Sequence, residues 1–174
     1  MTRRAGMTRR QLLAAAAAAG VAVQSGPAAP PAPAAAAVAP VGERLLGRGP
    51  WGTFRALAQT MLPAGAEMPG ADKSGVCEYI ERALEGPYSR YLGVYRRALA
   101  ELDSLARAGA GGPFDSLPAE RAREVVRKLE ASSPEDFALL RQHVLEGFLS
   151  DPVHGGNRDR LGWQAVGLVH KHKD

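Results

Sequence analysis

Residues 87–108 read PYSRYLGVYRRALAELDSLARA, and the spacing of their apolar side chains decides the fold class. Apolar side chains recur every three or four positions over about five turns, at Tyr88, Tyr91, Leu92, Tyr95, Ala98, Leu99, Leu102, Leu105 and Ala106. Arginines and acids fill the positions between them, which is typical of an amphipathic helix with one buried face. We therefore expect a long helix that residues 109–112 terminate, with the stripe of Tyr88, Tyr91 and Tyr95 in the core.

The same period continues on both sides of this segment. Residues 51–62 and 75–84 carry apolar stripes, and the segment between them, with two prolines and two glycines, predicts a loop. Pro118 at a first helical position and Ser133 as a cap mark the starts of two later helices. Their expected buried faces are Ala122, Val125, Val126 and Leu129, then Phe137, Leu140, Val144, Leu145 and Phe148. No segment alternates like a strand, so the sequence predicts an all-α fold, a small single domain of five to six helices.

The first 40 residues differ from the rest in composition. They hold 16 alanines, 5 of the 13 prolines, four arginines and no acid, which leaves 18 basic and 18 acidic side chains in the remainder. We divide the chain into an Ala/Pro-rich leader, residues 1–40, and a helical domain, residues 41–174. The domain lacks the basic excess typical of nucleic-acid binding, and no apolar stretch approaches the ~20 residues of a membrane span.

The leader is typical of an export signal. The adjacent pair Arg9 and Arg10 precedes a weakly apolar, alanine-rich run over residues 12–23, which favours the twin-arginine type that carries folded cargo. Residues 32–34 and 35–37 are acceptable cleavage sites. The alternative is a basic tail on a cytoplasmic protein. We expect a periplasmic protein that engages the twin-arginine translocase.

Cysteine content limits the cofactors of this chain. Cys77 is the single cysteine, which excludes a Cys-ligated iron–sulfur cluster, a Cys-rich zinc site and an internal disulfide. No Cys-x-x-Cys-His stretch is present to attach a haem. In an oxidising compartment Cys77 either forms a disulfide with a partner subunit or is a small packed side chain.

Residues 151–163 combine glycines with polar side chains. Two interpretations stay open. The first is a loop that docks on a partner, because arginine and tryptophan dominate interface energetics; its residues are Gly155, Gly156, Asn157, Arg158, Asp159 and Trp163. The second is an internal turn in which Arg158 pairs with Asp151 or Asp159 and Trp163 is buried. In both, Gly155 and Gly156 permit positive φ or close backbone approach, and Asn157 is a candidate cap for a short helix over residues 158–163.

His143 and Glu146 lie three positions apart on one predicted helix, near His154. This spacing suits a metal ligand set or an acid–base pair, but it is also common in solvated or capping pairs on amphipathic helices. We predict no catalytic and no metal-binding residue.

Several short motifs resemble those of a known family. They are LPA at residues 62–64, PGA at 69–71, VCEYI at 76–80, EGFLSDP at 146–152, GGNRD at 155–159 and GW at 162–163. Together with the leader, they resemble the gluconate 2-dehydrogenase subunit 3 family over about residues 54–167. The chain ends soon afterwards, so we expect any longer C-terminal contact of relatives to be missing.

The resemblance implies a non-catalytic small subunit of a membrane-associated dehydrogenase of sugars or sugar acids. In such complexes a large subunit binds FAD and a third subunit is a multihaem cytochrome c, so FAD and haem c are expected in the partners and no cofactor in this chain. The large subunit commonly lacks a signal, so the small subunit would escort it through export and remain bound. Two alternatives are a free-standing exported enzyme that uses His143, Glu146, Asp151 and His154, and a general periplasmic binding or chaperone module.

Overall fold

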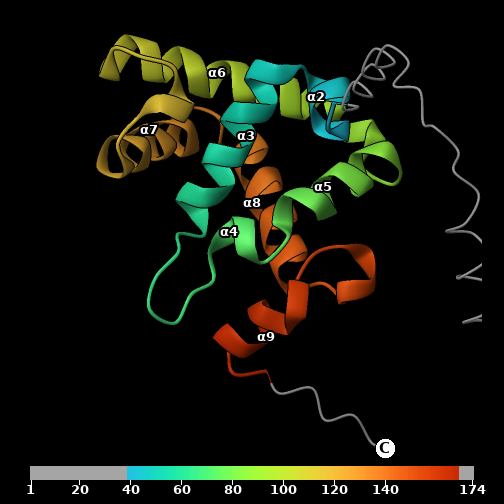
Figure 1. Cartoon of the computed structure of the whole chain (residues 1–174). Helices are drawn as coiled ribbons and strands as arrows, with labels where there is room; N and C mark the ends of the chain where they lie inside the picture. The colour runs from blue at the N-terminus through green and yellow to red at the C-terminus, as the bar shows by residue number, and fades with distance from the viewer. Residues whose placement is uncertain (1–38, 169–174) are drawn as a thin grey trace, which may run out of the picture. The chain divides into compact units, whose positions relative to one another are not determined.

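The long helix expected from residues 87–108 is present as α6 (Leu92–Ala110), which lies at the top of the domain in Figure 1. The computed structural model describes residues 39–168 of the chain. The first turn of the expected helix is instead a 3-10 turn, η1 (Ser89–Tyr91). The predicted apolar stripe of α6 is buried at Tyr95, Ala98, Leu99, Leu102 and Ala106. Gly111 ends the helix in the left-handed conformation, with φ of 79°.

The other four expected helices are also present. They are α3 (Arg48–Met61), α5 (Val76–Glu85), α7 (Ala119–Ser132) and α8 (Pro134–Leu149). The prediction of Pro118 at the first helical position is wrong: Pro118 is extended and precedes α7 by one residue, where its carbonyl accepts a hydrogen bond from the Ala122 amide. Ser133 precedes α8, but its side chain does not cap the helix; its hydroxyl donates instead to Glu101, 2.5 Å away. The all-α prediction is confirmed for the described residues.

Three short helices complete the described part, and two of them were not predicted. They are α2 (Val41–Leu46), α4 (Gly70–Lys73) and α9 (Leu161–Ala165). Residues 62–74 were expected to be a loop, yet they contain α4 and an isolated bridge between Ala64 and Pro69. Helices of four and six residues are too short for an apolar period to be recognised, so tertiary contacts have to hold them. The indole of Trp51, for example, covers Gly42 of α2 so closely that a Cβ there would lie 2.2 Å from the ring.

Helix α8 runs through the middle of the domain, with α7 on one side and α5 on the other (Figure 1). Helix α6 packs against α7, α3 and α8. The largest fully buried side chains of the described residues are Phe54, Tyr95, Phe114 and Phe148. At its C-terminal end α8 leads into two 3-10 turns, η3 (Pro152–His154) and η4 (Arg158–Arg160), and then into α9.

Parts of the sequence-based predictions lie outside the described residues. Arg9, Arg10 and both candidate cleavage sites belong to residues 1–38, so the export signal stays a prediction. Within residues 39–168, no helix is both long enough and apolar enough to cross a membrane.

Candidate functional site

The polar loop after α8 folds back onto the C-terminal end of that helix. Asn157 is fully buried at its centre: its amide nitrogen Nδ2 donates to the Ser150 carbonyl, and its backbone N–H donates to Gly147, both at 2.9 Å. Its Oδ1 accepts from the backbone of Gly162 at 2.8 Å and of Trp163 at 3.3 Å. Asn157 precedes η4 (Arg158–Arg160), the turn that starts where the capped helix was predicted, but its side chain does not cap that turn. It binds first-turn amides of α9, which begins at Leu161 and whose N-cap residue is Arg160.

Two glycines let the loop approach the end of α8. A Cβ at Gly156 would lie 2.1 Å from the Gly147 carbonyl oxygen, and one at Gly162 would lie 1.9 Å from that of Phe148. Backbone carbonyls cannot move aside as side-chain ends do, so both positions require glycine. The close backbone approach expected at Gly156 is thus present, and Gly155 has the expected positive φ, 97°.

Arg158 joins the loop to α5, 80 residues earlier in the chain. Its guanidinium lies 2.9 Å from the Glu78 carboxylate, and its backbone N–H donates to the Ser74 carbonyl at 2.9 Å. The pairing with Asp151 or Asp159 that an internal turn suggested is wrong. Both side chains of the Arg158–Glu78 pair are 48% exposed, so the pair lies at the surface.

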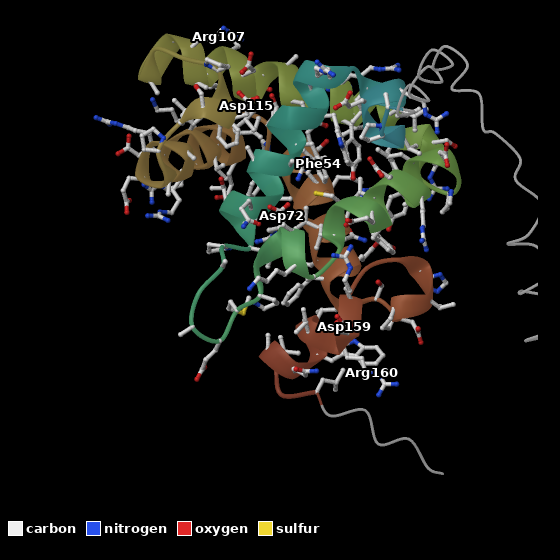
Figure 2. All side chains as sticks on the ribbon, viewed as in Figure 1. Phe54, Asp72, Arg107, Asp115, Asp159 and Arg160 are labelled. Atoms are coloured by element: carbon white, nitrogen blue, oxygen red, sulfur yellow. The ribbon has the colours of Figure 1, made fainter. Side chains whose placement is uncertain are left out.

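Other members of the predicted docking loop also reach the surface. Asp159 is exposed and lies beside Arg160 at the α9 end of the domain (Figure 2). Trp163 is half-buried, and its indole N–H donates to the Leu149 carbonyl at 2.8 Å. The structure therefore divides the six residues into a buried scaffold, Gly156 and Asn157, and a more exposed set; their docking role stays a prediction.

His143 lies inside a cluster of tyrosines from α5, η1 and α6. Its ring stacks on Tyr88 with centroids 3.8 Å apart, and its Nδ1 lies 3.1 Å from the Tyr95 hydroxyl. The Tyr88 hydroxyl in turn donates to Glu146 and lies 3.2 Å from the Tyr79 hydroxyl. Of the stripe assigned to the core, Tyr95 is fully buried, whereas Tyr88 and Tyr91 are half-buried at its edge.

This environment disfavours charge on the histidine. Burial, with a smaller contribution from Arg90, lowers the pKa of His143 to about 4, so the ring is neutral at pH 7. Burial also raises the pKa of Glu146 above its usual range. Its carboxylate accepts from Gln142 at 2.7 Å as well as from Tyr88. A neutral, stacked, hydrogen-bonded histidine is suited to packing.

The four residues of the enzyme alternative do not form one cluster. His143 is 2% exposed, whereas His154 is exposed on the loop. Asp151 accepts a hydrogen bond from the Val153 backbone at 3.0 Å, at the start of η3. Within residues 39–168, no group of three or more histidine, cysteine, aspartate or glutamate side chains is placed to hold a metal ion.

Cys77 is buried on the first turn of α5. Desolvation raises the pKa of its thiol to about 12, although Arg55 opposes the shift. A buried, protonated thiol is a poor nucleophile for disulfide exchange. These properties favour the packed alternative over the inter-subunit disulfide, which stays a prediction.

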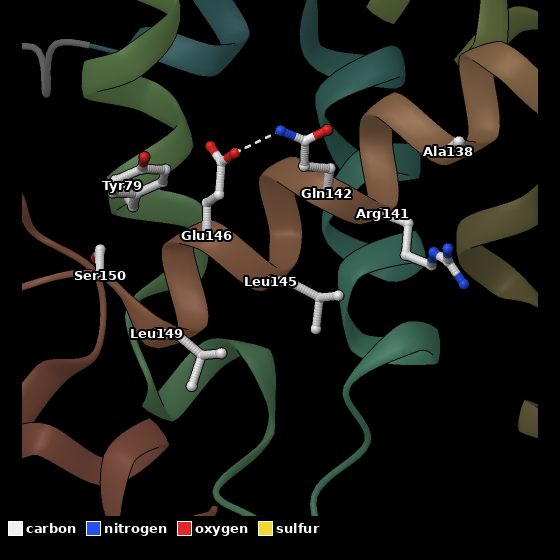
Figure 3. Close-up of a pocket in the computed structure, with 8 residues that line it drawn as sticks. All are labelled: Tyr79, Ala138, Arg141, Gln142, Leu145, Glu146, Leu149 and Ser150. Atoms are coloured by element: carbon white, nitrogen blue, oxygen red, sulfur yellow. Dashed lines mark hydrogen bonds between the residues drawn. The ribbon is translucent and has the colours of Figure 1, made fainter. Parts of the chain in front are cut away.

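Sequence reasoning missed a groove along the outer face of α8, shown in Figure 3. It has a volume of about 640 Å³, and its lining residues are Tyr79, Ala138, Arg141, Gln142, Leu145, Glu146, Leu149 and Ser150. Leu145 was expected in the core, but 42% of its surface is exposed, and Leu149 is 40% exposed. The signal was present in the sequence, because α8 carries apolar residues on more sides than one core can cover.

The fold and this groove define a small helical protein with an exposed apolar surface on its central helix. The family model of gluconate 2-dehydrogenase subunit 3 matches residues 50–168, and the chain belongs to that family. The motifs quoted above lie within the matched residues. Comparisons with curated proteins and with solved structures find no match.

Proposed function

We propose that this chain is the non-catalytic small subunit of an FAD-dependent dehydrogenase complex that oxidises sugars or sugar acids. Membership of the subunit 3 family over residues 50–168 is the observation that carries the proposal. In this proposal the catalytic flavin belongs to a large partner subunit, and a cytochrome c subunit accepts the electrons. The small subunit stabilises the flavoprotein by binding it.

The state of the reactive side chains supports a structural role. His143 is buried, neutral and stacked on Tyr88, and the Cys77 thiol is buried with a raised pKa. General acid–base catalysis needs a group that exchanges protons near the working pH and reaches the substrate. Neither of these side chains meets that requirement, and the groove on α8 has apolar side chains such as Leu145 and Leu149 among its lining.

The leader extends the proposal to export. Arg9 and Arg10 direct the chain to the twin-arginine translocase, and the flavoprotein crosses the membrane already folded and bound to it. The complex then works in the periplasm, where the small subunit remains attached. The composition and order of residues 1–40 support this step.

A double substitution tests the escort role. Arg9→Lys combined with Arg10→Lys keeps the charge of the leader but removes the arginine pair. We expect both this chain and its FAD-binding partner to accumulate in the cytoplasm, with periplasmic dehydrogenase activity lost. A matched control is Arg3→Lys with Arg4→Lys, which leaves the pair intact and should leave export unchanged. Unchanged periplasmic activity in the Arg9/Arg10 variant would contradict the escort role.

A second measurement tests the absence of catalysis in this chain. Asp151→Asn with His154→Ala alters exposed loop positions, and we expect the turnover of the assembled complex to stay within about twofold. Loss of a general acid or base costs about a hundredfold or more. A drop in turnover of that size in a fully assembled complex would contradict the non-catalytic role and favour the enzyme alternative.

A further inference from the structure

We propose that the groove along α8 is where the FAD-binding subunit docks, through an amphipathic helix that carries a basic and an acidic residue on its two sides. This inference rests on the proposed function, since it names the surface and the chemistry by which the two subunits meet. The proposed interface then comprises α8 as well as the loop of residues 155–163.

The centre of the groove is an apolar stripe. Ala138, Leu145 and Leu149 are spaced by seven and four positions, so they lie along one line of α8. Figure 3 shows Leu145 and Leu149 projecting to the same side of the helix. The two leucines are exposed although each belongs to the central helix of the domain. A helix that lies in an apolar groove buries such spaced anchors and gains the free energy of their desolvation.

Charged groups flank the stripe on opposite sides. Arg141 and Glu146 are five positions apart, which separates them by about 140° around the helix axis. Within residues 39–168 neither side chain forms a salt bridge; the carboxylate of Glu146 accepts only from Tyr88 and Gln142. A carboxylate has about four acceptor sites, so Glu146 can still accept from a lysine or arginine.

The partial burial of Glu146 strengthens the case for a basic partner. Desolvation raises the pKa of this carboxyl, and no nearby cation of the described residues offsets it. A cation from the partner would stabilise the charged form, as an opposite charge within a few ångströms does. An acidic residue on the other side of the docking helix would pair with Arg141 in the same way.

A second copy of this chain in an antiparallel arrangement matches the groove less well. Two antiparallel copies of α8 related by a twofold axis would bring the same flank of each helix together. Glu146 would then face the Glu146 of the second copy, and like charges repel. A different chain with opposite charges on its flanks avoids this repulsion.

The groove is also continuous with the predicted docking loop. Its far end is formed by Leu149 and Ser150, whose carbonyls accept from Trp163 and Asn157. A helix laid along α8 would thus reach the exposed part of the loop. The two surfaces together form one interface that runs from the middle of α8 to α9.

Binding of the full chain to its purified FAD-binding subunit tests the apolar stripe. We expect Leu145→Asp to weaken the affinity by at least about thirtyfold, the size of a hot-spot loss, and Leu149→Asp to have a similar effect. The matched control is Ala100→Asp, which adds the same charge at an exposed position of α6. It should change the affinity by less than about twofold, and the melting temperatures of the free variants should match the wild type.

The charged flank is tested by Glu146→Gln, which retains an oxygen that accepts from Tyr88. We expect about tenfold weaker binding and a smaller loss of affinity between low and high salt. Glu130→Gln, at an exposed position of α7, is the control and should keep the salt dependence of the wild type.

The outcomes separate the two proposals. If the wild-type chain does not bind the FAD-binding subunit, the proposed function fails and this inference fails with it. If the wild type binds and both folded leucine variants bind within about threefold of it, only the groove assignment is overturned. If the leucine variants bind the FAD-binding subunit more weakly but Glu146→Gln binds it as the wild type does, the apolar docking site stands. The proposal that a basic residue of the partner binds Glu146 is then overturned.

Discussion

The two faces of α8 differ in what covers them. On the inner face, Leu140, His143, Val144 and Phe148 are buried against other helices of the domain. On the outer face, Leu145 and Leu149 are equally apolar but remain 42% and 40% exposed. In the proposed complex, this exposed apolar surface is what the partner subunit covers. Helix α8 thus has one apolar face that the folded domain covers and a second that it leaves exposed.

Truncation on each face gives the largest expected contrast. Phe148→Ala removes a ring that is 2% exposed and leaves a cavity, so we expect a loss of about 3–5 kcal/mol in the free energy of unfolding. Leu149→Ala, the next residue on the outer face, should cost less than about 1 kcal/mol. Urea denaturation of both variants measures the difference. Similar losses would show that the outer face is already packed.

The buried histidine predicts how stability changes with pH. The pKa of His143 is about 4 in the folded state and near 6.5 when unfolded, so the unfolded chain binds more protons between these values. The contribution of the neutral His143 ring to the free energy of unfolding is therefore complete above pH 6.5. It is lost as the pH falls towards 4, by about 3 kcal/mol. When the free energy of unfolding is measured across this pH range, it should decline less in His143→Gln than in the wild type, because glutamine cannot titrate.

The matched control is His154→Gln, because His154 is exposed on the loop. This variant should retain the full decline of the wild type. An equal decline in His143→Gln and the wild type would mean that His143 is not held neutral by its tyrosine cluster.

A glycine substitution tests how tightly the loop closes the end of α8. Gly162→Ala would place a Cβ 1.9 Å from the Phe148 carbonyl oxygen, and we expect the required shift to cost about 1–3 kcal/mol. Gly93→Ala is the control, since nothing lies within 4 Å of its Cβ position in α6. It should leave the stability unchanged or raise it by up to about 1 kcal/mol. Thermal unfolding distinguishes the two, and equal melting temperatures would contradict the close approach.

The smallest expected effect is that of the surface pair between the loop and α5. Arg158→Ala should reduce the free energy of unfolding by less than about 1 kcal/mol, because both side chains are 48% exposed. Glu78→Ala should have a similar effect, and the double variant should lose little more. If Arg158 also docks on the partner, its variant will lower affinity for the FAD-binding subunit while Glu78→Ala will not. A stability loss above about 2 kcal/mol would assign Arg158 to the scaffold.

The sequence predicted the long helices well because their signals are local. The stripe of α6 from Tyr95 to Ala106 is buried as expected, and Gly111 terminates the helix near the predicted place. Prediction was weaker for the site. One of the two open interpretations of the loop pairs Arg158 with Asp151 or Asp159, close in sequence, whereas its partner is Glu78, 80 residues away. Burial of His143 beneath Tyr88 likewise depends on a contact between α8 and the residue that precedes η1, which no short motif encodes.

Helix positions, family membership and the absence of internal disulfides therefore follow from residue types and their spacing in the printed chain. Residue types and their spacing do not determine which of the apolar faces of α8 is covered. Periodicity reports that Leu145 and Phe148 are both apolar, but coverage depends on which helices pack around α8 in three dimensions. Helical period is a property of about four neighbouring residues, whereas burial is a property of segments brought together by folding. The exposed apolar face of α8 is therefore defined only in the folded domain.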